Sequence, residues 1–306
     1  MKQNLRKKAL VPAIAMVLVS VIALSGVTYA WFTTGNTASV TNLDVNVATA
    51  NGIQISLDAS SWRSTISATD LKNAISNANA YANRVIQYPE GEIAPVSSAG
   101  NIVNGKMEMF YGEYNKDGTL MSDAVADKNG TTDGNYIAFD LFFKSTSEQP
   151  LTFKLGDDAS FVKCIDVTTG EALNVGTDTA VRVAFLNLGS AATPEAARAL
   201  TVESGKALIW EPNSAKHANS EAASGKLDYK GFKAEFDAVA EDALSDDQVA
   251  SVTTFDESKE IVTLANGITK IRVYIWLEGQ DVDCINPISF GDFTTNLMFT
   301  VPEVEG

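Results

Sequence analysis

The start of the chain constrains it most, because a basic segment is followed by a long apolar run. Four lysine and arginine residues lie within 2–8, and the apolar stretch 9–32 comes next, with small residues up to Ala30. A positive start, an apolar middle and a small-residue end are the parts of a secretory signal peptide. We therefore predict a signal peptide at 1–30, cleavage between Ala30 and Trp31, and a chain secreted to the extracellular matrix or cell surface.

The same run is long enough for a second interpretation. Its 24 residues could cross a membrane as an uncleaved anchor. The positive residues would stay inside, so the remainder would face outward in either case. We expect contact with a membrane only through an uncleaved signal.

Charge excludes one class of partner. The whole chain has a net charge of −15, and loss of residues 1–30 removes four of the 23 basic residues and no acidic one, leaving −19. Such a surface offers little to neutralise phosphates, so we expect no nucleic-acid partner.

Alternating apolar and polar residues predict a protein made mainly of short strands. The alternation is clear at 43–47 and 53–57, and again near the end of the chain at 269–277 and 296–301. We predict a mainly β protein, an antiparallel jelly-roll β-sandwich with helical insertions, forming a single domain over 31–306.

Turn signals predict two hairpins within this fold. Strands at 136–144 and 151–155 flank a polar segment, and strands at 260–264 and 269–277 flank Asn266-Gly267, a dipeptide typical of tight turns. Phe139, Leu141 and Phe143 are expected to share one face of the first hairpin.

Two helices and one excursion interrupt the strands. Ser67 and Asp70 fit a capping box, and apolar residues at helical spacing predict an amphipathic helix over 67–86. Pro194 is expected to open a short helix after Thr193. The stretch 213–260 is rich in alanine, serine, lysine and acid, and we predict an insertion there.

The residues give little support for catalysis, so we predict no enzyme. His217 is the only histidine and lies in a polar context, which leaves a zinc site or a Ser-His-Asp triad without its usual ligands or nucleophile motif. We expect no metal site and no cofactor. Calcium remains a minor alternative at two acidic groups, which comprise Asp127, Asn129 and Asp133 in a loop, and Glu278, Asp281 and Asp283 after a strand.

The two cysteines leave two alternatives open. Cys164 and Cys284 are too few for a disulfide scaffold. In an exported protein they either pair with each other or remain two buried thiols, and spacing alone does not decide between these.

The signal region and parts of the body resemble a known family. Gly26–Thr33 (GVTYAWFT) resembles the signal region of the TasA/camelysin class, exported proteins that a dedicated SipW-type signal peptidase processes. The segment 272–281, with Asp283-Cys284, is similar to the terminal strand of clostridial relatives; 181–185 and 209–213 show a weaker likeness. The resemblance implies a jelly-roll subunit of a biofilm-matrix fibre on a Gram-positive cell, processed by that peptidase.

The resemblance also implies assembly by donor-strand complementation, in which the new N-terminus completes the sheet of a neighbouring subunit. The residues agree, because 31–47 is β-prone with one apolar face, and an extended segment can satisfy an open sheet edge. Head-to-tail contacts that do not close give filaments. With 31–50 as the candidate donor strand, the expected inserted residues are Phe32, Val40, Leu43, Val45 and Val47.

A monomeric surface adhesin or glycan-binding module is the alternative function. Exposed aromatic residues would then line a sugar-binding face, although packing in the core is the more economical interpretation. The candidates are Trp62, Trp210, Trp276, Tyr111, Tyr114 and Tyr136.

Overall fold

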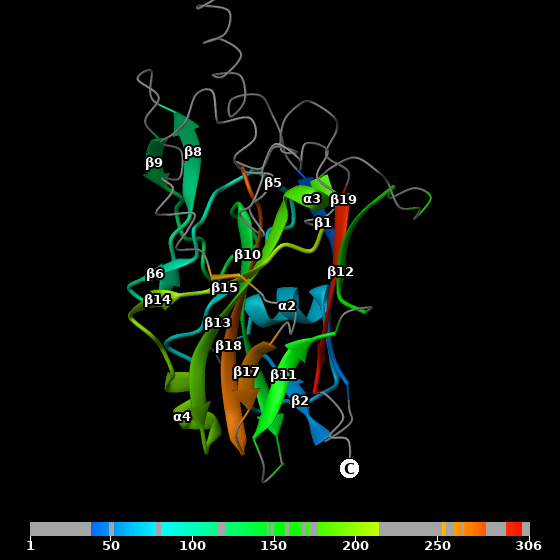
Figure 1. Cartoon of the computed structure of the whole chain (residues 1–306), viewed down its shortest axis with the longest axis vertical. Coiled ribbons are helices and arrows are strands. Elements are labelled where there is room, and N and C mark those ends of the chain that lie inside the picture. Colours follow the sequence, from blue (N-terminus) through cyan, green and yellow to red (C-terminus); the bar gives the residue numbers. More distant parts are fainter. Residues whose placement is uncertain are drawn as a thin grey trace, which may run out of the picture.

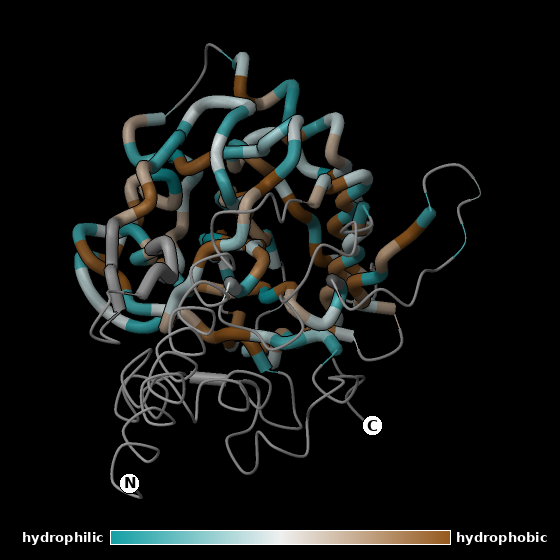
Figure 2. The backbone as a smooth tube through the Cα atoms, turned by 90° about the horizontal axis from the view of Figure 1, so that it is seen from above, coloured by the Kyte–Doolittle hydropathy of each residue, from teal (hydrophilic) through white to brown (hydrophobic). Residues whose placement is uncertain are grey.

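Two large sheets form the body of the protein (Figure 1). The computed structural model describes residues 38–48, 52–77, 81–114, 120–145, 147, 150–156, 159–166, 169, 171, 177–213, 253–254, 260–264, 266–279 and 292–301. Alternation of hydrophilic and hydrophobic residues is visible along much of the backbone in Figure 2, as expected of strands that bury one face.

We call the first sheet the terminal sheet, because it contains the first and the last described strands. Its order is β17-β11-β19-β1-β3, with β12 beside β19 and β5 beside β1. The strands are β1 (Ala38–Val47), β3 (Thr65–Ser67), β5 (Glu92–Ile93), β11 (Leu151–Leu155), β12 (Phe161–Ile165), β17 (Glu260–Leu264) and β19 (Asp292–Thr300).

We call the second sheet the central sheet, because its longest strands are buried on both faces. Its order is β16-β15-β13-β18-β10-β2, with β4 beside β10. The strands are β2 (Gln54–Ser56), β4 (Ile86–Gln87), β10 (Tyr136–Ser145), β13 (Val181–Ala191), β15 (Leu208–Trp210), β16 (Thr253–Thr254) and β18 (Gly267–Leu277).

Smaller elements complete the description. A three-stranded sheet joins β6 (Asn101–Val103), β7 (Lys106–Met107) and β14 (Ser204–Lys206), and a separate pair joins β8 (Phe110–Tyr114) to β9 (Leu120–Ala124). The helices are α2 (Ala68–Ile75), α3 (Thr177–Ala180) and α4 (Pro194–Ala199). As the sequence indicates, Thr193 caps α4 and Pro194 opens it.

The prediction of a mainly β protein with antiparallel sheets is confirmed. Two of the described strand pairs are parallel, β1 with β19 and β15 with β16. The pairings do not confirm the jelly-roll connectivity, and both sheets are open.

The main core lies between the two sheets. Phe143 and Phe185 of the central sheet meet Phe153 and Phe299 of the terminal sheet. The Phe299 ring lies 5.1 Å from the rings of Phe143 and Phe153 and 5.8 Å from that of Phe185. Such aromatic packing stabilises beyond the area it buries. Phe139, Leu141 and Phe143 share this inner face, as predicted.

The outer face of the central sheet is also covered. Ala138, Ala184, Tyr274 and Trp276 point away from the main core and pack in a second cluster, against the segment 85–109 and residues around Ile209. A strand in a sheet with both faces covered does not need to alternate apolar and polar residues. Accordingly, the first eight residues of β10 are all buried. This covering layer is why Trp276 is fully buried.

Both predicted hairpins are wrong. Strands β10 and β11 lie in different sheets, and so do β17 and β18. Each connection passes from one sheet to the other, because both strands of each pair place apolar side chains in the same core; the rings of Phe143 and Phe153 are 4.5 Å apart across it. The start of β18 requires glycine at position 267. Its φ is 129°, and an added Cβ would lie 2.8 Å from the Ala191 carbonyl oxygen.

The helix predicted over 67–86 is shorter. Its capping box is confirmed: the Ser67 hydroxyl accepts from the Asp70 amide and the Asp70 carboxylate accepts from the Ser67 amide. The helix ends at Ile75, and the Arg84 guanidinium donates to the Ala74 carbonyl at 2.6 Å. Ile86 then joins β4, because it pairs with β10 in the central sheet.

Candidate functional site

Strand β1 carries the described part of the predicted donor segment. Leu43, Val45 and Val47 are buried in the core between the sheets, and Val40 packs against it. Phe32 lies outside the described residues. The four side chains thus share one face, as the sequence predicts, and in this single chain they fill the chain's own core.

Neighbours flank β1 on both sides. It runs parallel to β19, from Val40 opposite Phe293 to Val47 opposite Phe299, and antiparallel to β3 and β5. After β1 the chain enters β2 in the other sheet. The slot between β19 and β3 therefore fits one apolar-faced strand, and β1 of the same chain occupies it.

The opposite face of β1 is polar and ordered by side-chain hydrogen bonds. The Thr65 hydroxyl donates to the Asn46 amide oxygen at 2.8 Å, and the Asn46 amide nitrogen donates to Asn296 at 2.8 Å. Asn296 donates onward to the Ala159 carbonyl. The hydrogen bonds of Thr65, Asn46 and Asn296 thus help to hold β3, β1 and β19 in register on the solvent side of the sheet.

Other sequence-based candidates fall partly or wholly outside the description. Ala30, Trp31 and His217 lie outside the described residues, and so does the predicted insertion at 213–260 except for residues 213, 253–254 and 260. Cys164 is buried in β12 and Cys284 lies outside the described residues, so both alternatives, a disulfide and two separate thiols, stay open. Within the described part of the chain, no helix has the length and apolar character needed to cross a membrane.

The acidic groups do not converge on a cation site where they are described. Asp127 pairs with Lys106, and the Asn129 side chain holds backbone groups of Arg84 and Ile86. Glu278 is buried and accepts from the Trp276 indole at 3.0 Å. Among the described residues no group of three or more His, Cys, Asp and Glu side chains could hold a metal ion.

Three of the six aromatic candidates for a sugar-binding face are buried. Trp210, Trp276 and Tyr136 are at most 7% exposed. Trp62 is half-buried beneath the Lys144 ammonium, which lies 5.7 Å from its ring. The side chains of Tyr111 and Tyr114 are not described. Trp210, Trp276 and Tyr136 therefore serve packing, the interpretation that the sequence analysis preferred.

A buried charge cluster, which sequence reasoning missed, lies on the outer face of the central sheet. The Asp140 carboxylate accepts from the Arg272 guanidinium at 2.6 Å, from Lys270 at 3.2 Å and from the Tyr81 hydroxyl at 2.9 Å. The Val85 amide donates to it as well. The signal was present in the sequence, since acid and base stand inside two strongly apolar strands, where they need partners.

Burial and pairing shift the pKa values in this cluster. Burial lowers the pKa of the Lys270 ammonium, although Asp140 opposes the shift. Burial also disfavours the charge of Arg272, but the Asp140 carboxylate outweighs it and raises the pKa of that guanidinium. Lys270 donates to the carbonyls of Arg198 and Leu200. With its groups engaged in this way, the cluster fastens α4 and the 81–85 segment to the sheet.

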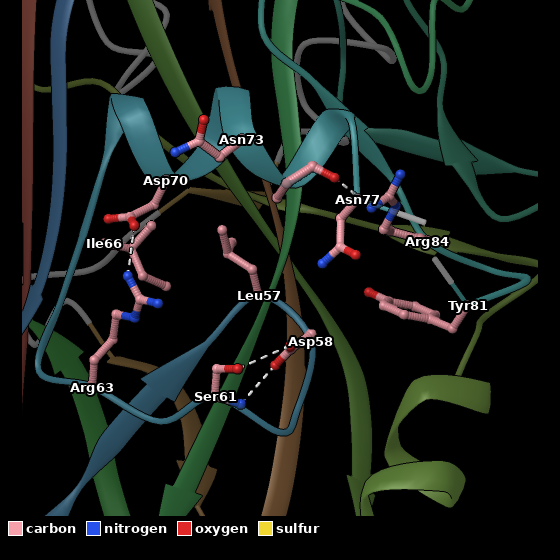
Figure 3. Close-up of a pocket in the computed structure, with 11 residues that line it drawn as sticks. Leu57, Asp58, Ser61, Arg63, Ile66, Asp70, Asn73, Asn77, Tyr81 and Arg84 are labelled. Atoms are coloured by element: carbon pink, nitrogen blue, oxygen red, sulfur yellow. Dashed lines mark hydrogen bonds and ion pairs between the residues drawn. The ribbon is translucent and has the colours of Figure 1, made fainter. Parts of the chain in front are cut away.

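A surface pocket of about 380 Å³ lies beside α2 (Figure 3). It is lined by Leu57, Asp58, Ser61, Arg63, Ile66, Asp70, Asn73, Ala74, Asn77, Tyr81 and Arg84. Most of its charged groups bind one another or the backbone. Arg63 pairs with Asp70 at 2.6 Å, Arg84 binds the end of α2, and Asp58 accepts four hydrogen bonds from nearby serines.

The hydrogen bonds to Asp58 outweigh burial and lower its pKa. The same hydrogen bonds stabilise the Asp58 carboxylate in its charged form and hold the loop 56–61 together. The charged groups of the pocket therefore serve to stabilise the loop and the end of α2. Its two acidic and two basic side chains cancel in charge.

Comparison with known proteins gives no assignment. No family model, curated protein or solved structure matches the chain.

Proposed function

We propose that the chain is an exported, non-enzymatic subunit of an extracellular biofilm-matrix or cell-surface fibre that polymerises head to tail. Its N-terminal strand would leave its own slot and occupy the slot of the next subunit, after a SipW-type peptidase cuts between Ala30 and Trp31. The observation that carries the proposal is β1: an apolar-faced strand close to the predicted cleavage point, seated between β19 and β3.

Exchange of an identical strand supports this assembly physically. The neighbour's β1 would make the same backbone hydrogen bonds and bury the same three core side chains that β1 buries in its own chain. Such swapping costs little in contacts, because the intrachain and interchain forms are equivalent there. The connection between Val47 and Gln54 is the segment whose path must differ, since it links the two sheets.

The jelly-roll connectivity belongs to the same proposal. A two-sheet body whose first described strand lies between two others in its sheet supports strand donation, because removal of that strand would expose unpaired backbone groups on β19 and β3.

Processing can be tested first. N-terminal sequencing of the secreted protein should begin at Trp31, and an intact Met1 would contradict release of the strand. The processed protein should form thin filaments by negative-stain electron microscopy.

Strand exchange is then tested by a disulfide across β1 and β19. We would introduce Asp44→Cys and Asn296→Cys, which lie directly opposite each other in β1 and β19, as a disulfide requires, in a Cys164→Ala, Cys284→Ala background. If β1 is exchanged, oxidised filaments should give a ladder of covalent multimers on a non-reducing denaturing gel.

A matched control uses strands that stay in one subunit. Lys163→Cys and Thr294→Cys face each other in β12 and β19, so their disulfide should give monomers only. If the Asp44–Asn296 cross-link in filaments also gives monomers only, strand exchange is excluded. A processed protein that forms no filaments would exclude the fibre function. Glycan binding by a processed protein that forms no filaments would favour the adhesin function.

A further inference from the structure

The first and last described strands lie side by side and point the same way. We infer that β1 and β19 form a mechanical clamp, which makes the folded chain resist tension applied through its two ends. This function goes beyond the proposed fibre assembly, because it concerns a chain whose own β1 is in place.

The parallel direction is what creates the clamp. The chain enters β1 beside the start of β19 and leaves β19 beside the end of β1. After Val40–Phe293 the register shifts once, and six consecutive pairs then run from Asn42–Thr294 to Val47–Phe299. Tension on the two ends would slide one strand past the other. The evenly spaced hydrogen bonds of the six consecutive pairs would then bear the force together. An antiparallel terminal pair pulled from its open end would instead lose its bonds one at a time.

Both faces of the clamp are held in register. On the inner face, Leu43, Val45, Leu297 and Phe299 are fully buried, so sliding by one residue would turn apolar side chains out of the core. On the outer face the Asn46–Asn296 hydrogen bond crosses the same pair. Beyond the last pair, the Ala48 amide donates to the Phe299 carbonyl at 3.0 Å.

The position of the clamp in the sequence places it first on the force path. All the other described strands and helices lie between β1 and β19 along the chain. They are therefore shielded from end-to-end tension until β1 and β19 separate. Forced unfolding is governed by the rate of the first rupture, and that rupture is the shearing of this pair.

The test compares two pulling directions in the same full-length fold by single-molecule force spectroscopy. Handles on Ser39→Cys and Thr300→Cys load the pair in shear. Handles on Ala48→Cys and Thr300→Cys are attached at the same end of the β1–β19 pair. Pulling them apart peels β19 from β1, starting at that end. Both use the Cys164→Ala, Cys284→Ala background. The rupture force should be several-fold higher in shear, up to about sixfold if the six consecutive pairs share the force equally.

A third molecule separates mechanical from thermodynamic stability. Trp276→Phe, with the shear handles, removes the indole hydrogen bond to Glu278 on the far face of the central sheet, so it should lower the unfolding free energy and leave the rupture force unchanged. Equal forces in the two directions, or a rupture force that falls with Trp276→Phe, would overturn the clamp. Filament formation plays no part in either readout, so failure of the clamp leaves the fibre proposal standing.

Discussion

The two large sheets bury their strands in different ways. In the terminal sheet, β19 alternates regularly between half-buried and buried residues, with one face on the core and one toward solvent. In the central sheet, ten of the eleven residues of β18 are buried. The extra burial comes from the 85–109 segment and α4, which cover the outer face. The same protein thus places polar residues in contact with water, Asn46 and Asn296 among them, on one outer face, and a buried, paired charge cluster on the other.

The difference shows what an outer face can tolerate. Asn46 and Asn296 on the terminal sheet can exchange their partners for water. Asp140, Lys270 and Arg272 on the central sheet cannot, because their side chains are at most 3% exposed. Removing one partner there leaves the others as buried charges.

The largest effect should follow loss of Asp140. Asp140→Ala leaves the Lys270 and Arg272 cations without their carboxylate, and we expect a loss of about 3–5 kcal/mol in unfolding free energy. Urea denaturation followed by circular dichroism measures it. The matched control is Asp44→Ala on the outer face of β1, which should stay within about 0.5 kcal/mol. Equal losses would remove the distinction between the two outer faces.

The inner faces should behave alike. Leu43→Ala in β1 and Leu141→Ala in β10 each open a cavity in the shared core, and each should cost about 2–5 kcal/mol in the same denaturation experiment. Asn42→Ala, at an exposed position of β1, is the control and should change little. A small loss at Leu43 beside a large one at Leu141 would mean that β1 leaves the core readily.

The Ser67 cap should contribute less. Ser67→Ala removes the acceptor for the Asp70 amide at the start of α2, which costs about 0.5–2 kcal/mol. Thermal unfolding at neutral pH measures the loss. Thr69→Ala, two positions after Ser67 at an exposed site of the same helix, is the control; a comparable loss there would show that the cap itself contributes nothing.

The smallest predicted change concerns a buried tyrosine at high pH. Burial, reinforced by Asp44 and Glu90, raises the pKa of Tyr88 from 10.0 to about 12. Between these values the unfolded chain releases a proton that the folded chain keeps, so the stabilisation is complete below pH 10 and is lost as pH rises toward 12. Denaturation midpoints at pH 9 and pH 11 should show this decline.

Tyr88→Phe should make that decline shallower. Its hydroxyl is buried without a hydrogen-bond partner, so the substitution should raise stability by up to about 1 kcal/mol at pH 8. Tyr81 and Tyr136 also have raised pKa values, so part of the pH dependence should remain. A slope identical to that of the unmodified protein would show that Tyr88 does not titrate in this range.

Several elements could be predicted because their causes are local. The Ser67–Asp70 capping box and the Pro194 helix start depend on residues three positions apart or fewer. The alternation in β1 and β19 depends on a sheet with one wet face. The length of α2 was not predicted, because Arg84 and the pairing of Ile86 with β10 compete with helical propensity from outside the local window.

The sequence by itself determined which side chains are apolar, where strands begin and which face of β1 is buried, because period-2 patterning and capping are properties of neighbouring residues. Only the tertiary structure decided which strands pair. The turn at Asn266-Gly267 separates two sheets, β1 lies against β19 across the whole chain, and Asp140 meets two cations. The reason is that such pairings depend on burial shared between distant segments, which no local pattern records.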